Sequence, residues 1–133
     1  MLNDLSPKKN QIVFGDDSVV IQKYISGIKG GRTLDVTGFP DTVIKAGHAI
    51  IKLANGNYAP MPVQGASYAI SLPDGAKFVG VLYRSIPTAK PAASIMTAGE
   101  VNSAAVHYRY SDLPEGEFKA ACPHIVFIND EEA

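Results

Sequence analysis

The sequence predicts a mainly β fold: a compact small β-barrel or β-tulip-like domain of short strands with one or two short helices, preceded by an extended N-terminal arm. Three observations support this prediction. Twelve glycines and nine prolines recur at short intervals, the apolar runs between them are short, and no apolar stripe of helical period covers most of the chain. Short apolar runs bounded by turn residues are typical of strands joined by tight connections.

The composition suits one packed domain of 133 residues. Hydrophobic residues make up 46% and charged residues 19%, and this balance excludes a disordered polyampholyte. The formal net charge of −1 argues against a nucleic-acid binder that relies on a general positive field. The sequence contains no run of about 20 apolar residues that would span a membrane, and its first residues lack the apolar core of a secretory signal.

Residues 1–31 are predicted to form the N-terminal arm, and residues 32–133 the β domain with a short acidic C-terminal tail. The first ten residues are polar. Two short strands follow, Gln11–Phe14 and Val19–Ile25, with a turn between them. Glycine reaches positive φ without steric cost, so we expect a flexible joint where three glycines gather: Gly27, Gly30 and Gly31.

The β domain is predicted to open with the strand Arg32–Thr37, in which apolar and polar residues alternate. His48–Leu53 is the next clear strand, and Asn55-Gly56 follows it. Asn-Gly between two extended runs is the strongest short-range signal for a hairpin, because a type I′ turn needs positive φ at both central residues. We therefore expect a hairpin with a type I′ turn at this place.

The middle of the chain alternates between loops and strands. Several prolines after the hairpin predict a loop-rich section at an edge of the sheet, since proline cannot donate to a strand ladder. Ala76–Arg84 is a strong strand, too apolar to be exposed on both faces. A loop leads to Ala93–Thr97, Gly99–Asn102 is predicted to be a turn, and Ser103–Tyr108 is either a strand or one helical turn.

The last elements are a short helix and a closing strand. Pro114–Ala121 suits a short helix, because proline is tolerated at a helix start and acidic residues favour the positive end of the helix dipole. Pro123 ends this helix, and His124–Ile128 is predicted to be the closing strand. The total is seven to nine short strands and one or two short helices.

Charge is unevenly distributed along the chain. Residues 1–110 carry eleven basic and seven acidic side chains, whereas residues 111–133 carry one basic side chain, Lys119, and six acidic ones. The terminal run Asn129–Ala133 is most simply a short solvated tail. The alternative is that this acidic run meets a basic patch on a partner.

Groups suited to catalysis are few. The three imidazoles, His48, His107 and His124, form no His-x-His or His-x-x-x-His pair. A metal site with Glu100 or Asp112 would therefore need convergence through the tertiary structure, and core or strand-end histidines are the favoured interpretation. The single cysteine, which cannot form an intramolecular disulfide, is predicted to be a small buried hydrophobe: Cys122. We predict no enzyme activity, no metal and no cofactor.

Two further motifs admit two interpretations each. Lys29-Gly30-Gly31-Arg32 is basic and glycine-rich, so it suits either a phosphate cradle or a hinge, and we favour the hinge. Tyr108 and Tyr110 flank Arg109 and would project from one face of a strand. They suit either a protein- or sugar-binding surface or half-buried packing, and we favour packing.

An ordered series of motifs adds a resemblance. Ala46-Gly47 leads through Ile50-Ile51-Lys52 to Asn55-Gly56-Asn57-Tyr58-Ala59-Pro60. Val79-Gly80-Val81-Leu82-Tyr83 follows one variable loop, and Gly99-Glu100-Val101-Asn102-Ser103-Ala104-Ala105-Val106 follows another. A short predicted helix and a last strand close the chain. This order, over about residues 32–128, resembles the head decoration proteins of tailed bacteriophages, the lambda type.

The resemblance implies a structural function. Proteins of this family are homotrimers on the outside of the expanded phage head, where they stabilise contacts between major capsid subunits. It implies two partners, the major capsid protein and further copies of the chain, with no direct contact to nucleic acid or membrane and no cofactor. The chain would be made in the host cytoplasm and would end on the capsid surface of the virion.

The resemblance also suggests contact residues. An arm that extends a capsid sheet makes the following residues candidates for capsid contact: Lys8, Lys9, Gln11, Ile12, Val13 and Phe14. Small residues that allow close approach of subunits make a second set candidates for the trimer interface: Gly99, Glu100, Val101, Asn102, Ser103 and Ala104.

Other functions stay open beside this one. The two strand-like runs of the arm are longer than a simple decoration arm needs, which opens a related interpretation. In that interpretation the chain is the base of a phage head fibre, or a head protein that contacts the host surface or a sugar. A third class is a small β-barrel enzyme or sugar-binding domain.

Overall fold

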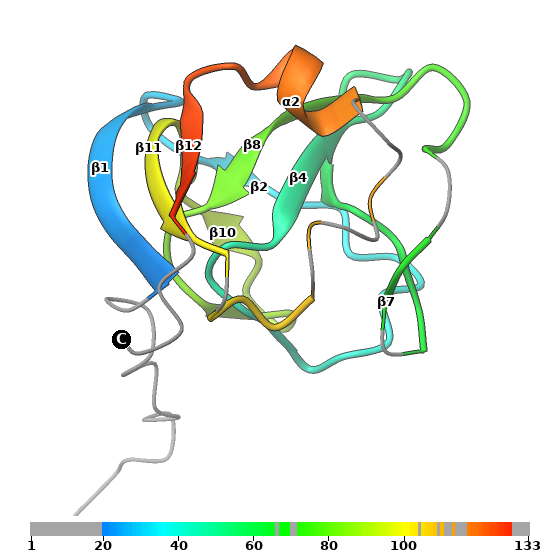
Figure 1. The fold of residues 1–133 in the computed structure, drawn as a ribbon. Helices are drawn as coiled ribbons and strands as arrows, with labels where there is room; N and C mark the ends of the chain where they lie inside the picture. The colour runs from blue at the N-terminus through cyan, green and yellow to red at the C-terminus, as the bar shows by residue number, and fades with distance from the viewer. Residues whose placement is uncertain are drawn as a thin grey trace, which may run out of the picture.

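The computed structural model describes residues 20–65, 67–69, 72–103, 105–108, 110, 113 and 117–128. Within these residues the chain forms twelve strands, six of them only two residues long, and one short helix. The mainly β prediction is therefore confirmed. The described strands do not close into a barrel, because the main sheet has two ends, at β1 and at β5 (Figure 1).

The main sheet has six strands in the order β1-β11-β8-β4-β5, with β12 also paired to β11. Their bounds are Ile21–Gly27 for β1, Ala49–Lys52 for β4, Tyr58–Pro60 for β5, Lys77–Leu82 for β8, Ile95–Asn102 for β11 and Ile125–Ile128 for β12. All of these pairs are antiparallel except β11 with β12. β8 pairs with the first two residues of β11, and β12 pairs with the last four. The sheet therefore splays where β8 separates from β11.

Three short antiparallel pairs complete the strand set. They are β2 (Arg32–Thr33) with β10 (Ala92–Ala93), β3 (Val43–Ile44) with β9 (Ile86–Pro87), and β6 (Val63–Gln64) with β7 (Ser67–Tyr68). The predicted strand Arg32–Thr37 is shorter than expected, because the chain leaves β10 after β2. Leu34 then forms an isolated parallel bridge with Tyr58, and this bridge joins the segment to the main sheet.

The predicted hairpin is confirmed, but its turn is of another type. β4 and β5 are antiparallel, with Lys52 opposite Tyr58. The Gly56 N–H donates to the Leu53 carbonyl (2.9 Å) and the Leu53 N–H to the Asn57 carbonyl (2.7 Å). This is a three-residue loop, a type I turn followed by a glycine bulge. It requires positive φ at one position, Gly56 (φ 93°), whereas a type I′ turn requires it at two.

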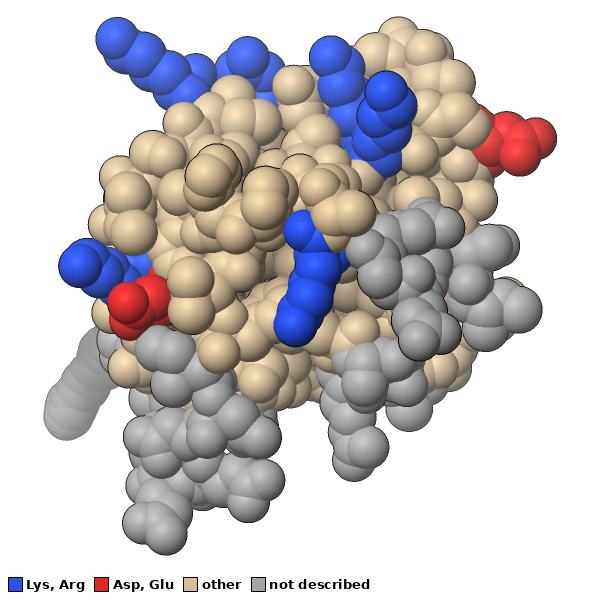
Figure 2. Space-filling model, turned by 45° about the horizontal axis from the view of Figure 1, so that its top comes forward, with Lys and Arg blue, Asp and Glu red and all other residues tan. Residues whose placement is uncertain are grey.

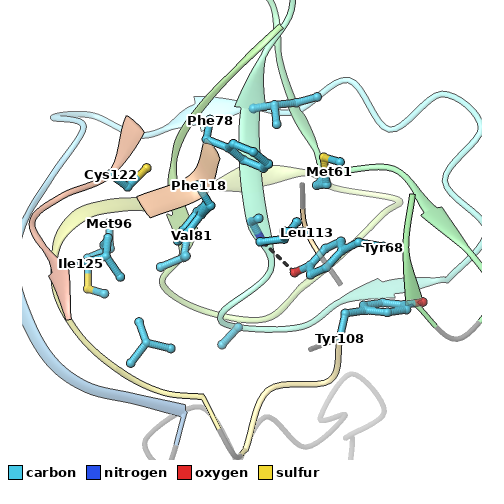
Figure 3. Close-up of a cluster of buried hydrophobic side chains, with 14 of the residues drawn as sticks. Met61, Tyr68, Phe78, Val81, Met96, Tyr108, Leu113, Phe118, Cys122 and Ile125 are labelled. Atoms are coloured by element: carbon cyan, nitrogen blue, oxygen red, sulfur yellow. Dashed lines mark hydrogen bonds between the residues drawn. The ribbon is translucent and has the colours of Figure 1, made fainter. Parts of the chain in front are cut away.

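The core consists of two apolar clusters on opposite faces of the main sheet. In β4, Ala49 and Ile51 belong to the first cluster and Ile50 to the second, and successive residues of a strand point to opposite faces. The helix α2 (Glu117–Ala121) covers the first cluster, where the Phe118 ring meets the Phe78 ring edge-on with centroids 5.2 Å apart (Figure 3). A strand covered on both faces reads as a continuous apolar run, which explains why Ala76–Arg84 shows little alternation.

The prediction of a turn at Gly99–Asn102 is wrong, because these residues are the second half of β11. β1 lies along one edge of this half and β12 along the other. A Cβ atom at Gly99 would overlap the backbone carbonyl of Lys23 on β1. Glycine therefore stands here to allow close approach of two strands, a use that a sequence pattern does not distinguish from a turn.

The C-terminal predictions fare differently. The described residues of the run Ser103–Tyr108 form neither a strand nor a helix; a turn begins there, in which the Ala105 N–H donates to the Asn102 carbonyl (3.1 Å). The short helix is confirmed over Glu117–Ala121, and the closing strand is confirmed as β12. Pro123 directly follows the last helical hydrogen bond, which Cys122 donates to Phe118 (2.8 Å).

Part of the predicted N-terminal arm lies in the main sheet. The predicted strand Val19–Ile25 corresponds to β1, which begins and ends two residues later and pairs with β11 along its length. The other predicted arm strand, Gln11–Phe14, lies outside the described residues. The division of the chain at residue 31 stays a prediction.

Candidate interaction surface

β1 is the most exposed strand of the main sheet. All of the residues 22–26 are exposed, including Tyr24 (46% exposed) and Ile25 (58%). Among the described strands, β1 pairs with β11 alone, along one of its two edges (Figure 1). The register of the pair shifts at three points, between Ile21 and Lys23, between Tyr24 and Ser26 and between Ser26 and Gly27. β-bulges of this kind bend a strand and break its alternation of inner and outer side chains.

Aromatic and basic side chains continue this surface beyond β1. The Tyr24 ring lies 4.7 Å from the Tyr83 ring, centroid to centroid, in a tilted arrangement. The Arg84 guanidinium lies 5.3 Å from the centroid of the same Tyr83 ring. Tyrosine and arginine are enriched at the centres of protein interfaces, because each combines a large apolar contact area with polar groups.

An open hollow of about 770 Å³ adjoins β1. Tyr24 forms part of its wall, Ala93 and Ile95 belong to its lining, and Lys29 and Arg32 contribute positive charge. The volume lies within the range of about 300–1,000 Å³ that is usual for ligand sites. The hollow is open, however, so it suits a segment of a partner better than an enclosed small molecule.

The glycine joint beside this hollow is a tight turn. The Gly31 N–H donates to the Ile28 carbonyl (3.2 Å), and Gly30 and Gly31 both have positive φ. Arg32 Nη1 donates to the carbonyls of Gly31 (2.6 Å) and Lys29 (3.3 Å) and so closes the turn. A phosphate cradle needs outward-facing amides, and the Gly31 amide is already engaged.

A second hollow, of about 230 Å³, is too small for a typical ligand site. Its lining includes Phe39 and four prolines: Pro40, Pro60, Pro62 and Pro73. Asp35 lies at this hollow, where its Oδ1 accepts hydrogen bonds from Thr37 Oγ1 (2.6 Å) and the Thr37 N–H (3.1 Å). These bonds lower the pKa of Asp35 and hold its carboxylate in its own turn.

The most polar part of the core surrounds His48. Its ring makes edge-on contacts with three aromatic rings, those of Phe39, Tyr68 and Tyr108. His48 Nε2 lies 2.9 Å from the Met61 carbonyl oxygen, and this nitrogen donates because a carbonyl only accepts. Burial lowers the pKa of His48 to about 4, so the ring is neutral at pH 7.

The tyrosines around His48 have hydrogen-bond partners within the chain. The Tyr108 hydroxyl donates to Asp41 Oδ2 (2.6 Å), the Tyr110 hydroxyl to the Gly47 carbonyl, and Tyr68 accepts from the Ala49 N–H (3.0 Å; dashed in Figure 3). Burial raises the pKa of all three, and that of Tyr108 to about 12. The preference for packing at Tyr108 and Tyr110 is confirmed, since Tyr108 is buried and Tyr110 half-buried, but the prediction that they lie on a strand is wrong.

The other candidate catalytic groups are two histidines and the cysteine. His107 and His124 are exposed, and no three His, Cys, Asp or Glu side chains of the described residues gather as metal ligands. Cys122 is buried, as predicted, and burial raises the pKa of its thiol to about 11. A thiol with this pKa is a poor nucleophile, because the thiolate is the reactive form. None of the described helices is long and apolar enough to cross a membrane.

Most of the predicted trimer-interface residues with described side chains lie inside the chain. Gly99, Val101 and Asn102 are buried in β11. Glu100 and Ser103 are half-buried, and Ala104 lies outside the described residues. The predicted capsid-contact residues also lie outside them: Lys8, Lys9, Gln11, Ile12, Val13 and Phe14.

The sequence interpretation missed the surface around Tyr24, Ile25 and Arg84. One signal was present, because the run from Gln22 to Ser26 has no period-2 alternation, which a strand with one buried face would show. The contact between Tyr24 and Tyr83 joins residues 59 positions apart and has no sequence signal.

No protein-family model matches the sequence, and searches among curated proteins and among solved structures give no significant match.

Proposed function

We propose that this chain is a capsid decoration protein of a tailed bacteriophage. It is a non-enzymatic protein that trimerises on the outside of the head and stabilises contacts between major capsid subunits. The proposal starts from the ordered motifs of residues 32–128. The structural observation that supports it most is β1, a strand that pairs with only one of the described strands and whose residues 22–26 are exposed, the apolar Tyr24 and Ile25 among them.

An edge strand of this kind is suited to pairing with another chain. Unpaired N–H and C=O groups along an exposed edge template pairing with another chain, and proteins usually protect such edges with charge, proline or a covering element. The exposed residues of β1 include one charged side chain, Lys23, beside Tyr24 and Ile25. A strand or loop of a partner that pairs with β1 would bury the two apolar side chains.

We assign the subunit contact of the trimer to β1. Gly99, Val101 and Asn102 are buried within a single chain, so they offer no surface to a second subunit. Tyr24 and Ile25 lie one strand away from them and are exposed. The capsid contact through the arm, at Lys8, Lys9 and Gln11–Phe14, remains part of the proposal as the sequence predicts it.

A head protein that contacts a sugar, or the base of a head fibre, is the second candidate. The Tyr24–Tyr83 pair with Arg84 above it favours this function, since one exposed and one half-buried aromatic ring beside a cation suit the faces and hydroxyls of a sugar. Binding of the isolated chain to a glycan array, lost on Tyr83→Ser, would favour this candidate over decoration.

The first test is oligomeric state. We expect a trimer by light scattering at micromolar concentration, and a shift to smaller species for Tyr24→Ser/Ile25→Ser. Val126→Ser is the matched control, because Val126 is also apolar and exposed (53%) but lies on β12, along the other edge of β11. A wild-type chain that stays monomeric would contradict the proposed trimer.

The second test is binding to the head. The full chain, added to expanded phage heads that lack it, should bind to a saturable number of sites in a sedimentation assay. Deletion of residues 1–14 should weaken this binding and leave the trimer intact. Absence of saturable binding by the full chain would refute the decoration function, and equal binding by the deletion variant would refute the role of the arm.

A further inference from the structure

A row of basic side chains crosses one end of the main sheet. Lys77 on β8 stands directly opposite Lys52 on β4, and Lys52 stands opposite Tyr58 on β5. Lys52 Nζ and the Arg32 guanidinium both lie 5.6 Å from the centroid of the Tyr58 ring. Arg32 in turn donates to the backbone carbonyl of Lys29, so the backbone at Lys29 lies close to Arg32. We call Lys29, Arg32, Lys52, Lys77 and Tyr58 the basic row.

The basic row has no counter-charge within the described part of the chain. None of its four cations forms an ion pair with a described carboxylate. Asp35, the closest carboxylate in sequence to Arg32, is bonded to Thr37. Like charges directly opposite each other on neighbouring strands are destabilising. Among the described residues, Lys52 opposite Lys77 is therefore an unfavourable arrangement, which an anionic group would relieve.

The same imbalance holds among the described side chains. Nine Lys and Arg side chains are described, but only four Asp and Glu side chains: Asp35, Asp41, Asp74 and Glu100. On the face drawn in Figure 2, blue basic side chains stand at several places and red acidic ones at few. The balancing acids are concentrated in the sequence after residue 110, with Asp130-Glu131-Glu132 as their densest run.

We propose that the basic row binds the acidic C-terminal segment, residues 129–133, of a second copy of this chain. Five extended residues span about 17 Å. The part of the row on β8, β4 and β5 spans about 10 Å, at about 4.8 Å for each step between strands. The segment is thus long enough to lie across the row, with carboxylates facing Lys77, Lys52 and Arg32.

The donor of the segment is a second copy because of where the segment begins. β12 ends at Ile128, paired with Asn102 and close to the start of β1. In Figure 1 this end of β12 is at the left, whereas β4 runs up and to the right, towards α2 at the top. Binding of the C-terminal segment of one copy to the row of the next makes a head-to-tail contact. Such contacts close into a ring when the rotation from one subunit to the next allows it. The inference rests on the proposed self-association and adds a second contact to it.

A peptide-binding assay tests the pairing directly. The protein is the chain without residues 129–133, and the probe is a labelled peptide with the sequence of these residues. We expect saturable binding by fluorescence anisotropy that weakens with salt, because exposed ion pairs are screened. Lys52→Glu/Lys77→Glu should weaken binding at least tenfold. A peptide with three lysines in place of its acids should bind this variant better than it binds the wild-type chain.

Matched controls keep the assay specific. Lys45→Glu/Lys90→Glu changes the net charge by the same amount at two exposed lysines outside the row, and it should leave peptide binding within twofold. Equal weakening by both double variants would overturn the inference, because attraction would then depend on net charge alone. Absence of peptide binding to the wild-type chain at 50 mM salt would also overturn the inference. A third contrary result would be a wild-type chain that binds a DNA oligonucleotide but not the peptide, with the DNA binding lost in Lys52→Glu/Lys77→Glu. Phosphate would then be the partner of the row.

The outcome can be separated from that of the proposed function. The chain without residues 129–133 is also added to phage heads. If it binds heads but no peptide binds the row, the decoration function stands and the inference fails. If the peptide binds the row but neither the full chain nor the chain without residues 129–133 binds heads, the inference stands and the decoration function fails.

Discussion

β4 and β1 belong to the same sheet and both contain isoleucine, yet the apolar residues of β4 are fully covered and β1 is open. Ala49, Ile50 and Ile51 of β4 are 0% exposed, whereas Ile25 of β1 is 58% exposed. β4 has a strand on each edge and an apolar cluster on each face; β1 has β11 on one edge. An apolar run therefore indicates a strand, but the number of its covered sides depends on the neighbours it meets. We infer that β4 serves stability and β1 serves contact.

The largest expected effect comes from the same substitution in the two strands. Ile51→Ala should lower the free energy of unfolding by about 2–5 kcal/mol, because it removes buried methyl groups and leaves a cavity. Ile25→Ala should change it by less than about 0.5 kcal/mol, since this side chain is mostly in water. Urea denaturation of both variants measures the difference. Equal losses would mean that β1 is covered as β4 is.

Acid should destabilise the covered region through His48, directly before β4. Its pKa is about 4 in the folded chain and about 6.5 when unfolded, so the unfolded chain binds more protons between these pH values. The contribution of His48 to the free energy of unfolding is therefore fully present above pH 6.5 and is lost as the pH drops to 4. The loss is about 3 kcal/mol in total. Asp41 and His107 also face this ring, with opposite effects on its pKa.

Urea denaturation at pH 7 and pH 4 checks this loss. His48→Gln keeps a donor for the Met61 carbonyl but has no group that titrates in this range. Its stability should fall less than that of the wild type between the two pH values, while other groups contribute equally to both proteins. An unchanged pH dependence would show that His48 is accessible to water.

Gly99→Ala should separate β1 from the covered part of the sheet. The new Cβ would overlap the Lys23 carbonyl, and we expect a loss of about 2 kcal/mol in unfolding free energy. Hydrogen exchange of the β1 amides should become faster than exchange in β4. Gly38→Ala is the control, because Gly38 also has positive φ but stands in open space, so it reports only the conformational cost of about 1 kcal/mol. Equal effects of the two variants would contradict a close approach at Gly99.

The smallest effect is expected at the outer side of β1. Tyr83→Leu removes the ring contact with Tyr24 and the cation contact with Arg84. We expect a loss of about 0.5–1 kcal/mol, because both contacts are partly in water. Thermal unfolding measures this loss. A loss as large as that of Ile51→Ala would show that the Tyr24–Tyr83 pair belongs to the core.

Prediction from the sequence succeeded where the determining interactions are local. The hairpin after β4 follows from Asn55-Gly56, and α2 and β12 follow from the turn residues around them. The type of the hairpin turn was wrong, because the same dipeptide also suits a three-residue loop with positive φ only at the glycine.

The sequence alone determined the mainly β class, the places of most strands and the shortage of catalytic groups, because these depend on short apolar runs, turn residues and composition. The tertiary structure decided which strands are covered, why Gly99 is a glycine, what surrounds His48 and which lysines stand together. Lys52 and Lys77 are 25 positions apart, and Tyr24 and Tyr83 are 59 apart. Contacts of this kind arise from the pairing of distant segments, and strand pairing depends on the whole sheet and not on the residues nearby.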